Sequence, residues 1–170
     1  HVILAEKLVS YQFSKGFHAV DAISELASYK PADKSIPFYV IGTCQGKDLV
    51  GLKYEQLLPY CLPAENPERA FCVIPGDFVT TEDGTGIVHT SPTFGADDAL
   101  VAKQAKPEIP PMLIKDENDN LVPLVDLQGK FRKELGFLAG KFVKNEYYDK
   151  GYIPEKSVDV EIAIKLKEQN

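Results

Sequence analysis

Several features that would define the class of this protein at once are missing from its 170 residues. There is no tryptophan, there is only one methionine, and no apolar run approaches the ~18 residues of a membrane-spanning helix. No signal-peptide pattern opens the chain, which starts His1-Val2-Ile3-Leu4 as if it were cut from a larger protein or carried a tag remnant. We therefore expect a cytoplasmic protein that does not enter a membrane.

Metal-binding residues are also scarce. The three cysteines, Cys44, Cys61 and Cys72, show no C-x-x-C spacing, and the chain has only three histidines to supplement them. A structural zinc site needs about four ligands at close spacing. The composition therefore predicts no metal, and it favours buried free thiols in a reducing compartment.

Basic clusters are missing as well. The net charge is −6, and no block of five or six lysines and arginines occurs. Because neutralisation of phosphates dominates the affinity of proteins for nucleic acids, this composition argues against a long nucleic-acid footprint. Any contact with RNA should be small, or supplied by other parts of a larger protein.

Short strand patterns fill the middle of the chain, and helical patterns lie at its two ends. Helical spacing covers 4–13, 21–29, 96–105, 137–143 and 158–164, although the apolar residues at 158–164 also alternate as in a strand. Strand patterns cover 38–42, 49–52, 70–74, 78–80, 87–90, 112–114 and 121–124. The turns at 46–48 and 116–120 predict hairpins. Together they predict one α+β domain over 1–170, with a closed or nearly closed β-barrel at about 36–125, peripheral helices, and a helical C-terminal part at about 129–170.

Residues 84–98 gather the side chains that could carry chemistry. Gly84-Thr85-Gly86 permits a close backbone approach or positive φ. A strand after it would place His89 and Ser91 on one face, because side chains alternate along a strand. Pro92 would end that strand and lead to the aspartates at 97–98 at a helix start. An imidazole, hydroxyls and a carboxylate could thus converge at the mouth of a barrel.

Each of these features also has a purely structural interpretation. The Gly-Thr-Gly sequence is often just a tight turn, and the aspartates at 97–98 could only complement a helix dipole, worth ~0.3–1 kcal/mol. His89 could be an ordinary polar strand residue. A serine hydrolase built on Ser91 and His89 is disfavoured, because no G-x-S-x-G elbow occurs in the chain.

The same segment resembles the editing-site signature of isoleucyl-tRNA synthetases. That signature reads Gly-Thr-Gly-x-Val-His-Thr-Ala-Pro, a short glycine-containing spacer and Asp-Asp; this chain has 84-GTGIVHTSP-92 and 94-FGADD-98. The related valyl and leucyl enzymes have Lys or Met in place of His89. The resemblance, which extends to 48–62 and 110–131, implies the barrel-shaped editing domain of these enzymes. It also implies post-transfer editing, an aminoacyl-tRNA deacylase activity that hydrolyses the ester of mischarged Val-tRNA(Ile). The parent would be an isoleucine-tRNA ligase that uses ATP and Mg²⁺.

The resemblance also implies roles for individual residues. Asp98 would hold the α-ammonium group of valine through a charge-assisted contact, and His89 would line the pocket beside the amino-acid side chain and the terminal ribose. These two are the candidate catalytic residues. The implied substrate-binding residues are Gly84, Thr85, Gly86, Thr90, Ser91, Phe94, Gly95 and Asp97. The implied partners are the 3′-terminal adenosine of tRNA(Ile) carrying valine and the rest of the synthetase, and the segment itself would need no cofactor.

The chain departs from the family pattern in two ways. Ser91 stands where alanine is usual, and the threonine-rich Thr-Thr-Thr-Pro-Trp-Thr-Leu-Pro strand of the pocket is not among these residues. Neither His-Ile-Gly-His nor Lys-Met-Ser-Lys-Ser, the ATP-handling motifs of the ligation site, is present. We therefore expect weak or no deacylase activity from the segment alone. The alternative functions are a module that binds a tRNA 3′ end without chemistry, and a serine esterase.

Overall fold

The computed structural model describes residues 1–169 and divides the chain into two compact units. The first unit comprises His1–Val50 and Pro75–His89, and the second comprises Gly51–Ile74 and Thr90–Asn170. The boundary at 89–90 falls inside the segment that resembles the editing signature. The candidate residues are therefore shared between the two units.

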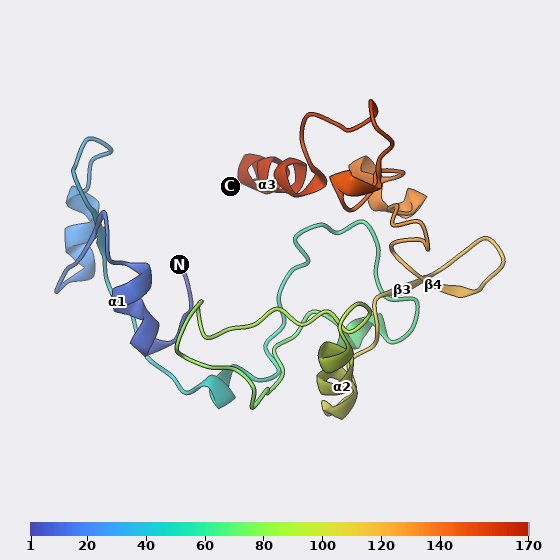
Figure 1. The fold of residues 1–170 in the computed structure, drawn as a ribbon. Helices are drawn as coiled ribbons and strands as arrows, with labels where there is room; N and C mark the ends of the chain where they lie inside the picture. The colour runs from blue at the N-terminus through green and yellow to red at the C-terminus, as the bar shows by residue number, and fades with distance from the viewer. Residues whose placement is uncertain (170) are drawn as a thin grey trace. The chain divides into compact units, whose positions relative to one another are not determined.

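The first unit contains short helices and one pair of parallel strands (Figure 1). Its elements are η1 (Glu6–Leu8), α1 (Val9–Gln12), β1 (Phe17–Ala19), η2 (Ile23–Ser28), β2 (Ile36–Phe38) and η3 (Gly46–Leu49). The Phe13 ring stacks on Phe38 at 4.8 Å between centroids and meets Phe17 edge-on at 5.1 Å. These aromatic contacts join the end of α1 to both strands. The apolar spacing that predicted a helix over 4–13 is confirmed, as η1 followed by α1.

The second unit carries the longer helices, with an antiparallel hairpin between them (Figure 1). Its elements are η4 (Pro67–Arg69), α2 (Ala96–Gln104), β3 (Leu113–Lys115), β4 (Leu121–Pro123), η5 (Lys133–Leu138), η6 (Asn145–Tyr147) and α3 (Val158–Glu168). In the hairpin turn, Asp116 Oδ1 accepts hydrogen bonds from the backbone N–H groups of Asn118 and Asn120, at 2.8 and 2.9 Å. This side-chain bonding explains why the turn at 116–120 could be predicted from sequence.

The core of the second unit lies between η5 and α3. Leu135, Leu138 and Val158 are buried together, and Ile162 packs against them. Val158 and Ile162 lie four residues apart and so share one face of a helix, whereas Val160 and Ile164 remain exposed. The alternating apolar residues near the C-terminus therefore belong to a helix.

The expectation of a closed or nearly closed β-barrel is wrong. Within residues 1–169 there are two sheets of two strands each and three isolated bridges, and neither sheet closes on itself. Residues 46–48, expected to be a hairpin turn, start the helical turn η3, where Asp48 Oδ2 accepts the Gln45 N–H at 2.9 Å. Residues 70–74 form no named strand, although the Lys53–Cys72 bridge and backbone hydrogen bonds such as that from the Gly51 N–H to the Val73 carbonyl, at 2.9 Å, join them to 51–54. Residues 78–80 and 87–90 form no strand.

The physical reason is that these strand patterns are three to five residues long and flanked by Gly and Pro. Such short runs gain stability mainly from the partners they pair with. Side chains such as Asp48 and Thr85 instead bond to nearby backbone groups, which offers the chain an alternative to a sheet ladder.

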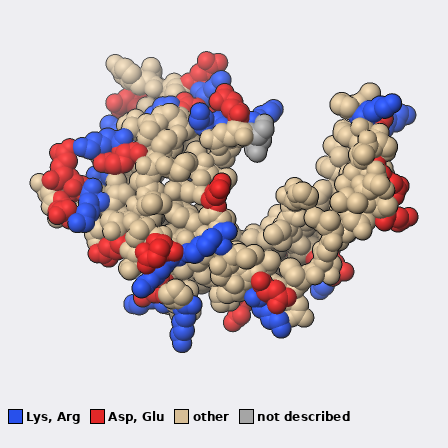
Figure 2. Space-filling model, turned by 180° about the vertical axis from the view of Figure 1, so that it is seen from behind, with Lys and Arg blue, Asp and Glu red and all other residues tan. Residues whose placement is uncertain are grey.

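Charged residues are mixed over the visible surface. Figure 2 shows lysine and arginine side chains next to aspartate and glutamate on the face that it presents, without one broad basic area. Among residues 1–169, no helix is both long enough and apolar enough to cross a membrane.

All three cysteines are free, as expected, but the expectation that they are buried is wrong for Cys44, which is exposed. Cys61 is half-buried, and burial, followed by the nearby negative charge of Glu134, raises the pKa of its thiol. A raised pKa leaves less of the reactive thiolate at a given pH.

We expect iodoacetamide at pH 7.5 to label Cys44 several-fold faster than Cys61, and we expect a higher pH to accelerate the labelling of Cys61. Peptide mass spectrometry measures both labelling rates. Equal rates would contradict the difference in exposure between Cys44 and Cys61 and the raised pKa of the Cys61 thiol.

Candidate functional site

The candidate residues of the first unit form a turn held by the N-terminal segment of the same unit. The Ala5 N–H donates to the Thr85 carbonyl at 2.8 Å, and the Gln12 side-chain amide donates to the Gly84 carbonyl. The Thr85 hydroxyl donates to the Ile87 carbonyl at 3.1 Å and accepts the Ile87 N–H at 3.3 Å. The Gly-Thr-Gly sequence thus has a structural role of its own, beside any role in substrate binding.

The two glycines of this turn face different constraints. Both have positive φ, +66° at Gly84 and +76° at Gly86. A Cβ at Gly86 would lie 2.6 Å from Ala5 Cβ, whereas a Cβ at Gly84 would meet nothing within 4 Å. Gly86 is therefore fixed by both backbone conformation and packing, and Gly84 by conformation alone.

Alanine substitutions should separate these two effects. We expect Gly84→Ala to cost ~1–2 kcal/mol of unfolding free energy, because it forces a left-handed conformation on a residue with a Cβ. Gly86→Ala should cost ~1–3 kcal/mol more, because its Cβ also overlaps Ala5. Urea unfolding of the two variants measures the difference. Equal losses would show that the contact with Ala5 is unimportant.

His89 lies outside any strand and is exposed. Its neighbours Ile87 and Val88 are also about half exposed, at 49% and 51%. The expectation that His89 and Ser91 share one face of a strand is therefore wrong, since residues 87–90 have no strand partner. The ring of His89 is accessible, and its role in lining a substrate pocket stays a prediction.

In the second unit, the candidate residues form a tight turn that leads directly into α2. The Ser91 carbonyl accepts hydrogen bonds from the N–H groups of Phe94 and Gly95, at 3.1 and 3.2 Å. The Gly95 carbonyl then accepts the Ala99 N–H at 2.8 Å, which starts the helix. Thr90 is half-buried at the start of this turn, and the Phe94 side chain is 60% exposed.

The two aspartates at the start of α2 have different surroundings. Asp97 is exposed, whereas Asp98 is half-buried and its Oδ2 accepts the Ser91 N–H at 2.9 Å. Among residues 1–169, no donor bonds to the other oxygen, Oδ1. One oxygen thus fixes the carboxylate while the second can accept a hydrogen bond from a cation such as an ammonium group.

Gly95 supplies the space that this carboxylate occupies. Its φ is −122°, which any residue adopts, but a Cβ at this position would lie 2.8 Å from Asp98 Oδ2 and 3.0 Å from its Cγ. Glycine leaves room here for the Asp98 carboxylate, which approaches the Gly95 backbone closely. A side chain would displace the carboxylate.

One residue of this turn was not among the sequence-based candidates. The Thr93 hydroxyl oxygen accepts the Met112 N–H at 2.8 Å and so links the turn to the segment just before β3. The two residues lie 19 positions apart. No local sequence signal predicts such a contact.

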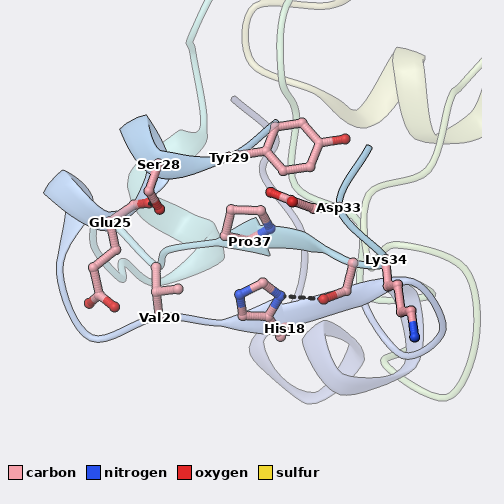
Figure 3. Close-up of a pocket in the computed structure, with 9 residues that line it drawn as sticks. His18, Val20, Glu25, Ser28, Tyr29, Asp33, Lys34 and Pro37 are labelled. Atoms are coloured by element: carbon pink, nitrogen blue, oxygen red, sulfur yellow. Dashed lines mark hydrogen bonds between the residues drawn. The ribbon is translucent and has the colours of Figure 1, made fainter. Parts of the chain in front are cut away.

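A polar pocket of about 200 Å³ lies in the first unit, lined by residues between 18 and 37 (Figure 3). Ser35 Oγ and His18 Nδ1 form a hydrogen bond of 2.7 Å at its edge. Each of the two carboxylates that line the pocket accepts a hydrogen bond from a backbone N–H group three residues earlier: Glu25 from Ala22, and Asp33 from Lys30. None of the candidate residues lines this pocket, and no sequence pattern indicated it.

Potential metal ligands are dispersed in this structure. Over the described residues 1–169, no three or more His, Cys, Asp or Glu side chains come together in a group that could hold a metal ion.

Comparison with known proteins gives a consistent set of relatives. The chain is 50% identical to the isoleucine--tRNA ligase of Cytophaga hutchinsonii over 179 aligned residues, which cover 99% of this chain and 15% of that protein. It is 45% identical to the isoleucine--tRNA ligase of Porphyromonas gingivalis, with 85% of this chain and 14% of that protein covered. It is 44% identical to the isoleucine--tRNA ligase of Bacteroides fragilis, with 99% and 15% covered. The chain thus spans about 15% of the length of these relatives. No family model matches it.

Proposed function

Because the chain belongs to the isoleucyl-tRNA synthetase family, we propose that it is a segment that hydrolyses valine wrongly attached to tRNA(Ile). The proposed substrate is the ester between valine and the 3′-terminal adenosine, and the proposed partner is the remainder of the synthetase. Ligation of isoleucine with ATP and Mg²⁺ is proposed for the whole protein.

The energetics of amino-acid selection explain why such an enzyme needs, besides its ligation site, a second site that hydrolyses wrong products. Valine lacks one methylene of isoleucine, and one methylene in an apolar pocket gives only ~1–3 kcal/mol of discrimination; isoleucyl-tRNA synthetases are themselves the established example of this limit. A pocket that admits valine and refuses isoleucine removes the errors that the first selection leaves. Editing thus adds discrimination that binding alone cannot supply.

The observation that carries the proposal is the anchored carboxylate of Asp98. Its Oδ2 accepts the Ser91 N–H at 2.9 Å, so the carboxylate is fixed on the protein before any substrate binds. The α-amino group of an aminoacyl ester is a cation, and a positioned carboxylate binds and orients it through a charge-assisted hydrogen bond. Asp98 is also the position at which the family signature places this contact.

In the proposed reaction, water adds to the carbonyl carbon of the ester. The bond between that carbon and the ribose oxygen then breaks, and valine and uncharged tRNA are released. Asp98 would hold the ammonium group, and His89 would line the pocket beside the valine side chain and the ribose. Positioning of the water, assisted by the neighbouring ribose hydroxyl of the substrate, would supply the rate enhancement.

The proposal is tested with the full-length enzyme that carries this segment. We expect it to release valine from Val-tRNA(Ile) at least tenfold faster than it releases isoleucine from Ile-tRNA(Ile), measured with radiolabelled amino acids. A module that only binds the tRNA end would retain the charged tRNA without releasing valine, and that result would refute a hydrolytic role. The isolated 170-residue chain should be weak or inactive, because the threonine-rich strand of the family is not in its sequence.

A further inference from the structure

We propose that Thr93 is a positioning residue that holds the Asp98 carboxylate in place for the substrate ammonium group. This role rests on the proposed editing function, because Thr93 can position Asp98 for a substrate only if Asp98 binds that substrate. Two hydrogen bonds, joined through the backbone turn at 91–95, connect the segment just before β3 to the carboxylate, entirely within the second unit.

The first link fastens the turn to a strand that is itself held in place. The Thr93 hydroxyl oxygen accepts the Met112 N–H at 2.8 Å. The next residue, Leu113, begins β3, which pairs with β4, and its carbonyl also accepts the Ala64 N–H at 2.8 Å. Thr93 is therefore bonded to a segment whose position is determined by two further backbone contacts.

The second link connects Thr93 to Ser91 through the turn. The Ser91 carbonyl accepts the N–H groups of both Phe94 and Gly95, so residues 91–95 form one compact turn with Thr93 at its centre. The Ser91 N–H then points to the carboxylate and donates to Asp98 Oδ2. Movement of Thr93 would therefore shift the donor that fixes Asp98.

The far end of α2 is held by a separate contact. The Ile109 N–H donates to the Ala102 carbonyl at 3.0 Å, so the chain after α2 folds back on the last turns of the helix. The helix body would stay in place if the Thr93 bond were lost. Loss of this hydrogen bond is expected to displace the turn at 91–95 and the Asp98 carboxylate, which are the parts proposed to lie closest to the substrate.

The hydroxyl of Thr93 is the part that matters. Valine has nearly the same shape but no oxygen, so Thr93→Val would leave the half-buried segment at Met112 with an unpaired N–H group. Thr93→Ser keeps the oxygen and loses only a methyl group. The two variants therefore separate the hydrogen bond from side-chain volume.

The test uses the full-length enzyme, with Val-tRNA(Ile) deacylation and isoleucylation measured on the same preparations. Because a displacement of about 1 Å can reduce a rate by about 100-fold, we expect Thr93→Val to lower kcat/KM for deacylation by roughly 10- to 100-fold. Thr93→Ser should stay within about threefold of the wild type. Unchanged isoleucylation in both variants shows that the protein is folded.

Two inhibitors distinguish positioning of Asp98 from a general structural role. A non-hydrolysable valyl-adenosine analogue carries the ammonium group, and its counterpart carries a hydroxyl there instead. Thr93→Val should weaken inhibition of deacylation by the first analogue about tenfold and by the second less than twofold. Equal weakening of both, or wild-type deacylation by Thr93→Val, would overturn the role of Thr93. If Asp98→Asn left deacylation unchanged, the editing proposal itself would fail, so the two failures are distinct.

Discussion

Replacing Asp98 with asparagine in the full-length enzyme should lower kcat/KM for Val-tRNA(Ile) deacylation by about 100-fold or more. The substitution keeps the shape of the side chain, and its amide oxygen can still accept the Ser91 N–H. It removes the negative charge that would pair with the ammonium group of valine, and truncating one partner of such a charge pair costs ~2–5 kcal/mol. Release of radiolabelled valine from Val-tRNA(Ile) measures the loss.

Asp97→Asn is the matched control for this experiment. It removes the same charge from the adjacent residue of α2, but Asp97 is exposed and bonds to none of the groups that fix Asp98. The family resemblance also places Asp97 among the substrate-binding residues, but its side chain is exposed, so we expect Asp97→Asn to lower deacylation at least tenfold less than Asp98→Asn does, with isoleucylation unchanged in both variants. Equal losses from the two substitutions would mean that only the net charge of the helix start matters.

A single added methyl group at Gly95 should impair editing almost as strongly. The φ of −122° suits alanine, so the backbone is not strained by Gly95→Ala. Its Cβ would, however, lie 2.8 Å from Asp98 Oδ2, closer than the two atoms can approach. The carboxylate must move, and a displacement of about 1 Å is enough to reduce deacylation by roughly 10- to 100-fold. Kinetics of valine release from Val-tRNA(Ile) measure this effect.

Gly42→Ala provides the comparison. A Cβ at Gly42 would meet nothing within 4 Å, and the φ of this residue is not positive. Deacylation and isoleucylation should both match the wild type in this variant. If Gly95→Ala also edited Val-tRNA(Ile) normally, the close approach of Asp98 to Gly95 would have no functional importance.

The elements that sequence analysis predicted well are those whose signals are local. The hairpin at β3 and β4 has its turn fixed by the Asp116 side chain, four residues or fewer from its partners. Helix α2 begins after Gly95 with two acidic residues in its first turn, which complements the helix dipole. Helix α3 begins after Ser157, whose hydroxyl accepts the Val160 N–H. These interactions can be inferred from a few neighbouring residues.

The strand content could not be predicted reliably for the opposite reason. Whether a short apolar run forms a strand depends on a partner far away in the sequence, and the run itself does not identify that partner. Residues 87–90 are rich in β-branched side chains, as strands are, yet in this structure they pair with no strand. The family resemblance implied the barrel fold as well, so both arguments led to the same wrong expectation for this structure.

For the site, the resemblance placed both aspartates in the site but assigned the contact with the ammonium group to Asp98 and not to Asp97, although the two have the same chemistry and are adjacent in the sequence. The structure shows a physical difference between them, because only Asp98 is half-buried and accepts the Ser91 N–H. The roles of Gly95 and Thr93 could not be predicted. They depend on close approach and on a contact between residues 19 positions apart.

The most direct measurement of the central claim is a crystal structure of the full-length enzyme bound to a non-hydrolysable valyl-adenosine analogue. We predict that the α-amino nitrogen of the analogue lies about 2.7–2.9 Å from Oδ1 of Asp98, while Oδ2 keeps its bond to the Ser91 N–H. An amino group bound by other residues, with the Asp98 carboxylate out of contact with the analogue, would contradict the account.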